Sequence, residues 1–157
     1  MRARMESMVL IDRPVDDVFR FLLDLETALP AVDRDVAAVE RTPPGSIGVG
    51  TTFAVRRTGH QPFGRGPRRD TIRYTAVEPN RRIAFVGRFG PIAPTAQLTF
   101  APTNGGTRVL FRGTPNPVGP LRLLTPLLAR VGQRMWHQRL ARIKTLLEKP
   151  GGHEHGP

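Results

Sequence analysis

The sequence predicts an α+β fold, in which a curved antiparallel sheet of about seven strands wraps around one long C-terminal helix. Two observations support this prediction. Residues 35–113 form successive segments of alternating apolar and polar residues, separated by turn residues. From residue 125 the period becomes helical and stays so to residue 148. A sheet with one dry face needs a cover, and the final helix is the only other long element.

The first 30 residues predict a strand followed by two short helices. Residues 5–12 have the alternation of a strand, and Pro14 suits the first position of a helix. Apolar residues then recur at helical spacing: Val15, Val18, Phe19 and Leu22. A second short helix is expected over residues 24–30, ending near Pro30.

The middle of the chain predicts a meander of strands. They are expected over residues 35–42, 50–58, 69–77, 81–89, 94–101 and 107–113. The Gly/Pro-rich segment 59–67 is long for a hairpin, and we expect it to form a mobile lid. Asn104 and Gly105 favour a tight hairpin turn.

The long helix is expected over residues 125–148. Its predicted apolar stripe consists of Leu124, Leu128, Val131, Met135, Leu140, Ile143 and Leu147. We therefore expect a single domain over residues 1–149, followed by a disordered tail over residues 150–157.

Composition narrows the class of protein. The 157 residues carry 24 Lys and Arg against 13 Asp and Glu, a net charge of +11. The absence of cysteine excludes disulfides, thiolate metal sites and a cysteine nucleophile. The arginines are scattered and no DNA-binding motif is present, so no specific nucleic-acid partner is predicted. The apolar run 8–11 is too short for a membrane span or a signal peptide, which predicts a cytoplasmic protein.

Five segments have a characteristic order and spacing. They are MVLIDRPVDDVFRFLLD at 8–24, VGTTF at 49–53, VEPNRRIAF at 77–85, GGTRVLF at 105–111 and LLTPLLARVGQRMWHQRLARIKTLLE at 123–148. Together they resemble the START-like (SRPBCC) superfamily with its helix-grip fold, most of all the bacterial polyketide cyclase/dehydrase and lipid-transport group. This resemblance implies a ligand cavity between the sheet and the last helix.

The candidate ligand-binding residues are those that the alternation and the helical period direct inward. They are Phe53, Val55, Tyr74, Phe85, Gly87, Leu98, Phe100, Val109 and Phe111 on the strands, and Leu128, Gly132, Met135, Trp136 and Arg139 on the helix. A plain packed core is the alternative. Gly87 and Gly132 favour a cavity, because each removes side-chain volume from an inward face.

Few polar residues are candidates for chemistry. Arg139 falls within the apolar arc, so it must reach solvent, pair with an acid or meet a polar ligand group. Tyr74 either donates to a ligand carbonyl or is a core ring with its hydroxyl tied to a neighbour. Asp33 and Asp35 are expected in a surface loop, and His60 and His137 have no nearby acid. We therefore predict no catalytic residue, no metal site and no cofactor.

Three functions follow in order of preference. The first is binding of a hydrophobic small molecule, such as a lipid, a polyketide or an isoprenoid-like compound. The second is a polyketide cyclase/aromatase or dehydratase that uses the same cavity. The third is a polyanion-binding module, which the net charge of +11 suggests. The sequence leaves the oligomeric state open.

Overall fold

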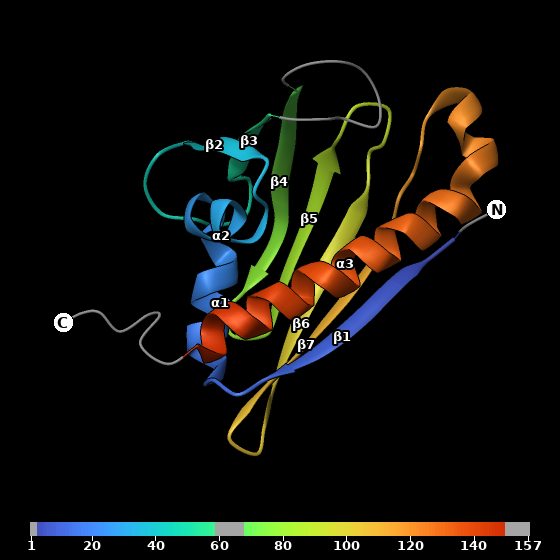
Figure 1. Ribbon diagram of the computed structural model, residues 1–157. Helices are drawn as coiled ribbons and strands as arrows, with labels where there is room; N and C mark the ends of the chain where they lie inside the picture. The colour runs from blue at the N-terminus through green and yellow to red at the C-terminus, as the bar shows by residue number, and fades with distance from the viewer. Residues whose placement is uncertain (1–2, 59–67, 150–157) are drawn as a thin grey trace.

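The computed structural model describes residues 3–58 and 68–149, which form a seven-stranded antiparallel sheet and a long helix that lies across it (Figure 1). The strands are β1 (Met5–Ile11), β2 (Val36–Thr42), β3 (Thr52–Arg57), β4 (Arg68–Glu78), β5 (Arg82–Arg88), β6 (Thr95–Thr103) and β7 (Gly106–Thr114). The helices are α1 (Val15–Leu23), α2 (Leu25–Val32), the short 3-10 helix η1 (Gly119–Leu124) and α3 (Thr125–Glu148). The predicted fold class is confirmed. The expected lid at 59–67 and tail at 150–157 lie outside the described residues.

The sheet is a meander closed by the first strand. Its order is β1-β7-β6-β5-β4-β3-β2, so only β1 pairs with a strand distant in sequence. Val9 lies opposite Val109 in the β1–β7 register. The predicted turn between β6 and β7 is confirmed, and Gly105 adopts a φ of +79°, which favours glycine. This order leaves one continuous apolar face for the helices to cover.

The two short helices cover one end of that face. Phe19 of α1 packs edge-on against Phe100 of β6, with ring centroids 5.3 Å apart. The side chain of Asp24 accepts a hydrogen bond of 3.2 Å from the Glu26 N–H and so begins α2. The expected end of this helix near Pro30 is wrong, because α2 continues to Val32. Pro30 removes a helical hydrogen bond and crowds the preceding turn, but Leu29 and Val32 on either side of it are buried, which favours a helix that continues past it.

The long helix has the predicted bounds but a different buried face in its first half. Leu140, Ile143 and Leu147 are buried as expected, whereas Val131 and Met135 are about half exposed. The reason for this different buried face is the glycine at position 132. A Cβ atom at Gly132 would overlap the side chain of Met5 on β1, so the helix and the strand approach each other at this glycine. The larger apolar side chains of this half therefore turn outward.

Candidate ligand-binding site

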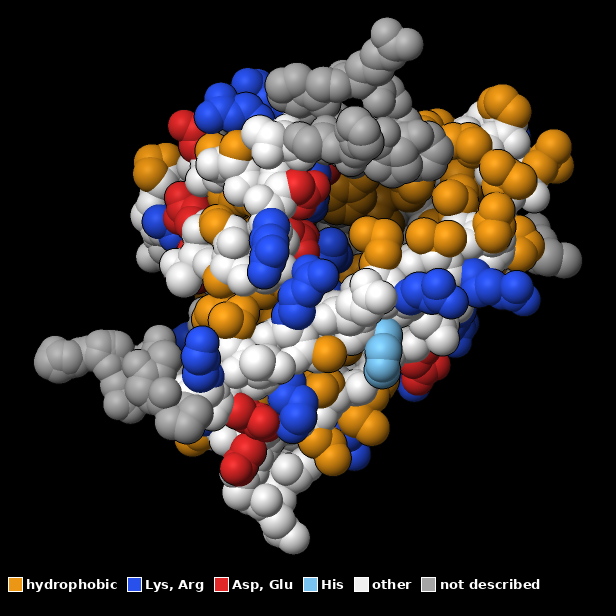
Figure 2. All heavy atoms as spheres, viewed as in Figure 1, with side chains coloured by type: hydrophobic (Ala, Val, Ile, Leu, Met, Phe, Trp, Pro, Cys, Tyr) orange, Lys and Arg blue, Asp and Glu red, His pale blue; other side chains and the backbone are white. Residues whose placement is uncertain are grey.

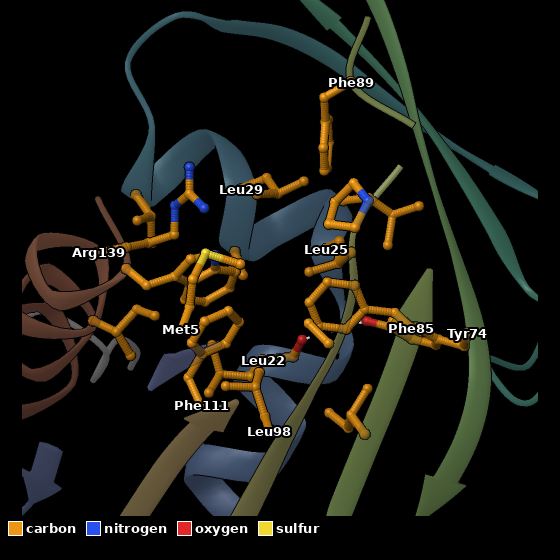
Figure 3. Close-up of a pocket in the computed structure, with 18 of the residues that line it drawn as sticks. Met5, Leu22, Leu25, Leu29, Tyr74, Phe85, Phe89, Leu98, Phe111 and Arg139 are labelled. Carbon is orange, nitrogen blue, oxygen red and sulfur yellow. Dashed lines mark hydrogen bonds between the residues drawn. The ribbon is translucent and has the colours of Figure 1, made fainter. Parts of the chain in front are cut away.

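A cavity of about 100 Å³ lies between the sheet, α2 and α3. Figure 2 shows a hollow with hydrophobic side chains in this part of the molecule. In Figure 3, Met5, Leu25, Phe85 and Phe111 surround a common space, and Arg139 lies at its edge. In another protein, an apolar cavity of about 150 Å³ stays dry and takes up benzene. The space here is therefore close to, but somewhat below, the volume that a single small ring needs.

Six of the fourteen sequence candidates line this cavity. They are Tyr74, Phe85, Leu98, Phe111, Trp136 and Arg139. Four others are buried in the core without lining it: Phe53, Val55, Phe100 and Val109. Alternation assigns a residue to a face of the sheet but not to a position along it. Phe100 faces inward, for example, but Phe19 already occupies the space in front of it.

Two helix candidates lie away from the cavity. Met135 is 49% exposed and Leu128 is partly exposed, and neither lines the space. Both residues were predicted to face inward because they belong to the apolar stripe of α3. In this half of the helix the stripe faces outward, because α3 approaches β1 through another face.

The two glycines make room for side chains rather than for a ligand. At Gly87 a Cβ atom would lie 2.8 Å from the ring of Phe89, and at Gly132 it would overlap Met5. Neither glycine lines the cavity, although Met5 and Phe89 do. The interpretation of both glycines as empty volume is therefore wrong. Each lets a larger side chain fold back to form part of the wall.

An aromatic group forms one side of the cavity. The Trp136 ring stacks on Phe111, with centroids 4.0 Å apart and planes 12° from parallel. Phe85 lies 6.3 Å from the same indole ring. The guanidinium carbon of Arg139 lies 4.8 Å from the Trp136 ring centroid, within the range of a cation–π contact. The only tryptophan of the chain is therefore part of the cavity wall.

Helix α2 supplies the residues that the sequence analysis missed. Leu25, Ala28, Leu29 and Val32 all line the cavity. Their helical spacing places them on one face of α2, so the pattern carried the signal. The sequence alone does not show that this face turns toward α3.

Arg139 pairs with an acid, which is one of the outcomes left open by the sequence. Its Nη2 atom donates to Oδ2 of Asp33 at 3.0 Å, and its Nε to Oδ1 at 3.4 Å. Asp33 is buried, so its expected place in a surface loop is wrong. Burial lowers the pKa of the Arg139 guanidinium, an effect that the charge of Arg57 increases and that of Asp33 opposes. An arginine remains charged under such shifts.

A second guanidinium, that of Arg57, lies at the same end of the cavity. Its Nε donates to Asp70 at 2.8 Å, and its Nη1 to Asp35 at 3.1 Å. Both Arg57 and Asp70 could have been found in the sequence. Arg57 continues the inward alternation of Phe53 and Val55, and Asp70 lies opposite Val55 in the β3–β4 register. Opposite charges at inward positions of neighbouring strands indicate a buried pair.

Tyr74 is held by the backbone of α1. Its hydroxyl donates to the carbonyl oxygen of Leu23 at 2.7 Å. Burial raises the pKa of this hydroxyl well above its usual value, and the charge of Asp24 adds to the shift. The ring lines the cavity, but its proton is already engaged. The interpretation of Tyr74 as a donor to a ligand therefore fails in this geometry, and its interpretation as a core ring with a tied hydroxyl is correct.

The chemistry available to the cavity is narrow. Among the described residues, the side chains with polar atoms that line it are Arg57, Tyr74, Trp136 and Arg139, with no carboxylate or imidazole. The part of the chain that the structure describes also contains no group of three His, Asp or Glu residues placed to hold a metal. Nη1 of Arg139 has no acceptor among the described residues, so it is free to donate to an oxygen of a bound molecule. This arrangement can hold and polarise an oxygen, but it supplies no base.

The comparisons with known proteins agree with this geometry. The model of the family "Polyketide cyclase / dehydrase and lipid transport" matches residues 2–148. No curated protein matches the sequence. No helix within the described residues is long and apolar enough to cross a membrane.

Solved structures with low sequence identity share the fold. The crystal structure of TTHA0849 from Thermus thermophilus is 20% identical with a TM-score of 0.67, over 90% of this chain and 94% of that one. Ara h 8.0201 is 15% identical with a TM-score of 0.71, over 91% and 96%. The di-domain ARO/CYC protein BexL of the BE-7585A biosynthetic pathway is 18% identical with a TM-score of 0.73. The match covers 94% of this chain and 48% of BexL, about half of that two-domain protein.

Proposed function

This chain belongs to the polyketide cyclase / dehydrase and lipid transport family, and from that premise we propose that it binds a hydrophobic small molecule in the cavity between the sheet, α2 and α3. The ligand class is a lipid, a polyketide or an isoprenoid-like compound, of which a cavity of about 100 Å³ encloses only a part about as large as one ring. The observation that carries the proposal is the cavity itself, whose lining is apolar except at one end. The cytoplasmic location stays a prediction of the sequence.

The polar end of the cavity favours a neutral oxygen on the ligand. The two guanidinium groups there, those of Arg57 and Arg139, are already paired with the buried carboxylates of Asp33 and Asp70. An anionic ligand would bring an unbalanced charge into a poorly solvated space, which is costly. A carbonyl or hydroxyl oxygen accepts a hydrogen bond from Arg139 without that penalty. We therefore infer a ketone, aldehyde or alcohol rather than a carboxylate.

Three ligands of one shape test this proposal. Ethylbenzene, acetophenone and benzoate share a single ring and differ at the polar end, and saturation-transfer NMR detects even weak binding of each. We expect acetophenone to bind most tightly, ethylbenzene more weakly and benzoate most weakly. The neutral hydrogen bond should be worth about 0.5–1.5 kcal/mol. Absence of saturation transfer to all three ligands would contradict binding in the cavity, and benzoate as the best ligand would contradict the neutral oxygen.

Catalysis of a ring closure or dehydration is the second candidate. The similarity of the fold to a di-domain ARO/CYC protein favours it, as does the free donor of Arg139 at the cavity edge. A guanidinium can stabilise the charge that develops on a carbonyl oxygen in such reactions. A poly-β-ketone thioester incubated with the protein tests this role. Cyclisation faster than in buffer would favour a catalyst, and an unchanged rate would favour a binding protein.

A further inference from the structure

An exposed apolar ridge lies outside the cavity, on η1 and the first half of α3. Figure 2 shows hydrophobic side chains gathered over this corner of the molecule. The ridge consists of Val118, Leu123, Leu124, Leu127, Val131 and Met135, each exposed by 44% or more. Leu123 is the most exposed, at 86%. Isolated exposed apolar residues are ordinary, whereas a contiguous group of this kind marks an interaction site.

The geometry of α3 separates the ridge from the buried face. Leu124, Leu127, Val131 and Met135 recur at intervals of three or four residues and so share one side of the helix. Arg130 and Arg134 are exposed and lie beside this stripe, on the flank next to β1, where they border a surface hollow together with Arg4 and Glu6. Arg122 of η1 is also exposed. The helix therefore presents an apolar line bordered by guanidinium groups.

The charge of the chain is concentrated in the same region of the sequence. Residues 79–147 contain eleven Lys and Arg and no Asp or Glu. The remainder of the chain is balanced, with thirteen residues of each sign. All of the net charge of +11 thus lies in the segment that carries the ridge. Glu6 of β1 borders the same hollow as Arg130 and Arg134, but it is paired with Arg112 at 3.4 Å.

We propose that the ridge docks on an anionic lipid bilayer. Its aliphatic side chains would enter the acyl boundary, while Arg122, Arg130 and Arg134 contact lipid phosphates, the arrangement typical of interfacial helices. Apolar side chains that protrude from a protein can enter the lipid interface directly, so a bilayer needs no groove that matches the ridge. A second copy of this chain is disfavoured, because two ridges face to face would bring their arginines together. A nucleic acid offers nothing to cover the apolar line.

The ridge also lies next to the cavity along the helix. Arg139, one turn beyond Met135, lines the cavity, as does Trp136. Docking would therefore bring the cavity close to the bilayer surface. The inference stands on the exposed residues and the charge distribution, and it does not require that the cavity holds a ligand.

Sedimentation with vesicles of phosphatidylcholine alone, or with added phosphatidylglycerol, tests the proposal. We expect binding to the anionic vesicles and little to the neutral ones. The double variant Leu127→Gln/Val131→Gln should weaken binding about tenfold or more. Arg130→Gln/Arg134→Gln should weaken it about fivefold per arginine. Leu10→Gln is the matched control, since Leu10 is 53% exposed on β1, next to Lys144 in the second half of α3, and should bind like the parent.

Three results would overturn the proposal. The first is equal sedimentation of the parent and the Leu127→Gln/Val131→Gln variant at a matched far-ultraviolet circular dichroism spectrum. The second is absence of binding to anionic vesicles, and a dimer that the same variant dissociates would then identify a second copy of the chain as the occupant. The third is a preference for DNA over anionic vesicles at the same salt concentration.

Discussion

Arg139 on α3 and Asp33 at the end of α2 form a two-point ion pair, with N–O distances of 3.0 and 3.4 Å. The pair joins two helices that wall the cavity. A carboxylate at a helix C-terminus opposes the helix dipole, and three guanidinium groups surround this one. Besides Arg139 they are Arg57 and Arg142, and Arg142 also donates to the Val32 carbonyl at 2.9 Å. The position of α2 over the cavity therefore depends on this cluster.

Removal of the Arg139 guanidinium should destabilise the fold. We expect Arg139→Gln to lower the free energy of unfolding by about 3 kcal/mol, because it leaves a buried carboxylate with weaker partners. In a double-mutant cycle with Asp33→Asn, the two losses should not add, with a coupling of about 0.5–3 kcal/mol. Urea denaturation measures all three variants.

The exposed pair of Arg112 and Glu6 is the control for that cycle. Its N–O distance is 3.4 Å and both side chains are 50% exposed. Arg112→Gln should therefore change the free energy of unfolding by less than about 1 kcal/mol. Equal effects of Arg139→Gln and Arg112→Gln would show that the buried cluster does not hold α2.

Tyr74 should make the fold sensitive to alkali. Burial raises the pKa of its hydroxyl in the folded state, while the unfolded chain ionises near pH 10, the reference value being about 10. This stabilisation is fully present below the unfolded pKa and is lost progressively as the pH rises above it. The loss approaches about 1.4 kcal/mol per pH unit.

Absorbance of tyrosinate measures this effect, because Tyr74 is the only tyrosine of the chain. We expect the tyrosinate signal to appear together with loss of the far-ultraviolet circular dichroism, and Tyr74→Phe to remove the corresponding slope from the pH dependence of stability. A tyrosinate signal that rises near pH 10, as expected for an exposed tyrosine, in a folded protein would contradict the burial of this hydroxyl.

Gly132 should not tolerate a large side chain. Gly132→Leu would place its side chain where Met5 now lies, and we expect overpacking to cost about 1–3 kcal/mol despite the better helix propensity of leucine. Combination with Met5→Ala should restore part of this stability, because each change then compensates the other. Thermal unfolding of the three variants tests this, and strictly additive losses would exclude the contact.

Residue periodicity predicted the order of the strands and the α-helices, because alternation and helical spacing are local properties of the chain, but it did not predict η1. It failed where packing between distant segments decides. Pro30 lies within α2 rather than at its end. Val131 and Met135 turn outward because Met5 approaches Gly132. Sequence spacing contains no information about this approach.

In the candidate site, too, local patterns predicted some residues, and packing between distant segments decided the others. Trp136 and Phe85 were predicted from their faces, and both line the cavity. Asp33 was missed because its burial depends on arginines far away in the sequence, such as Arg139. The sequence could have predicted that Arg57 faces inward, because the inward alternation of β3 extends to this residue.

Ligand binding in the cavity is tested most directly by the fluorescence of Trp136, the only tryptophan of the chain, during titration with acetophenone. Ala28 lines the cavity on α2, whereas Ala31 is exposed on the same helix, so Ala28→Leu and Ala31→Leu form a matched pair. We expect acetophenone to change the fluorescence of the parent and of Ala31→Leu with the same affinity. Ala28→Leu, which fills the cavity, should abolish the change and keep or raise the thermal midpoint. Equal affinity of all three proteins would contradict the cavity as the binding site.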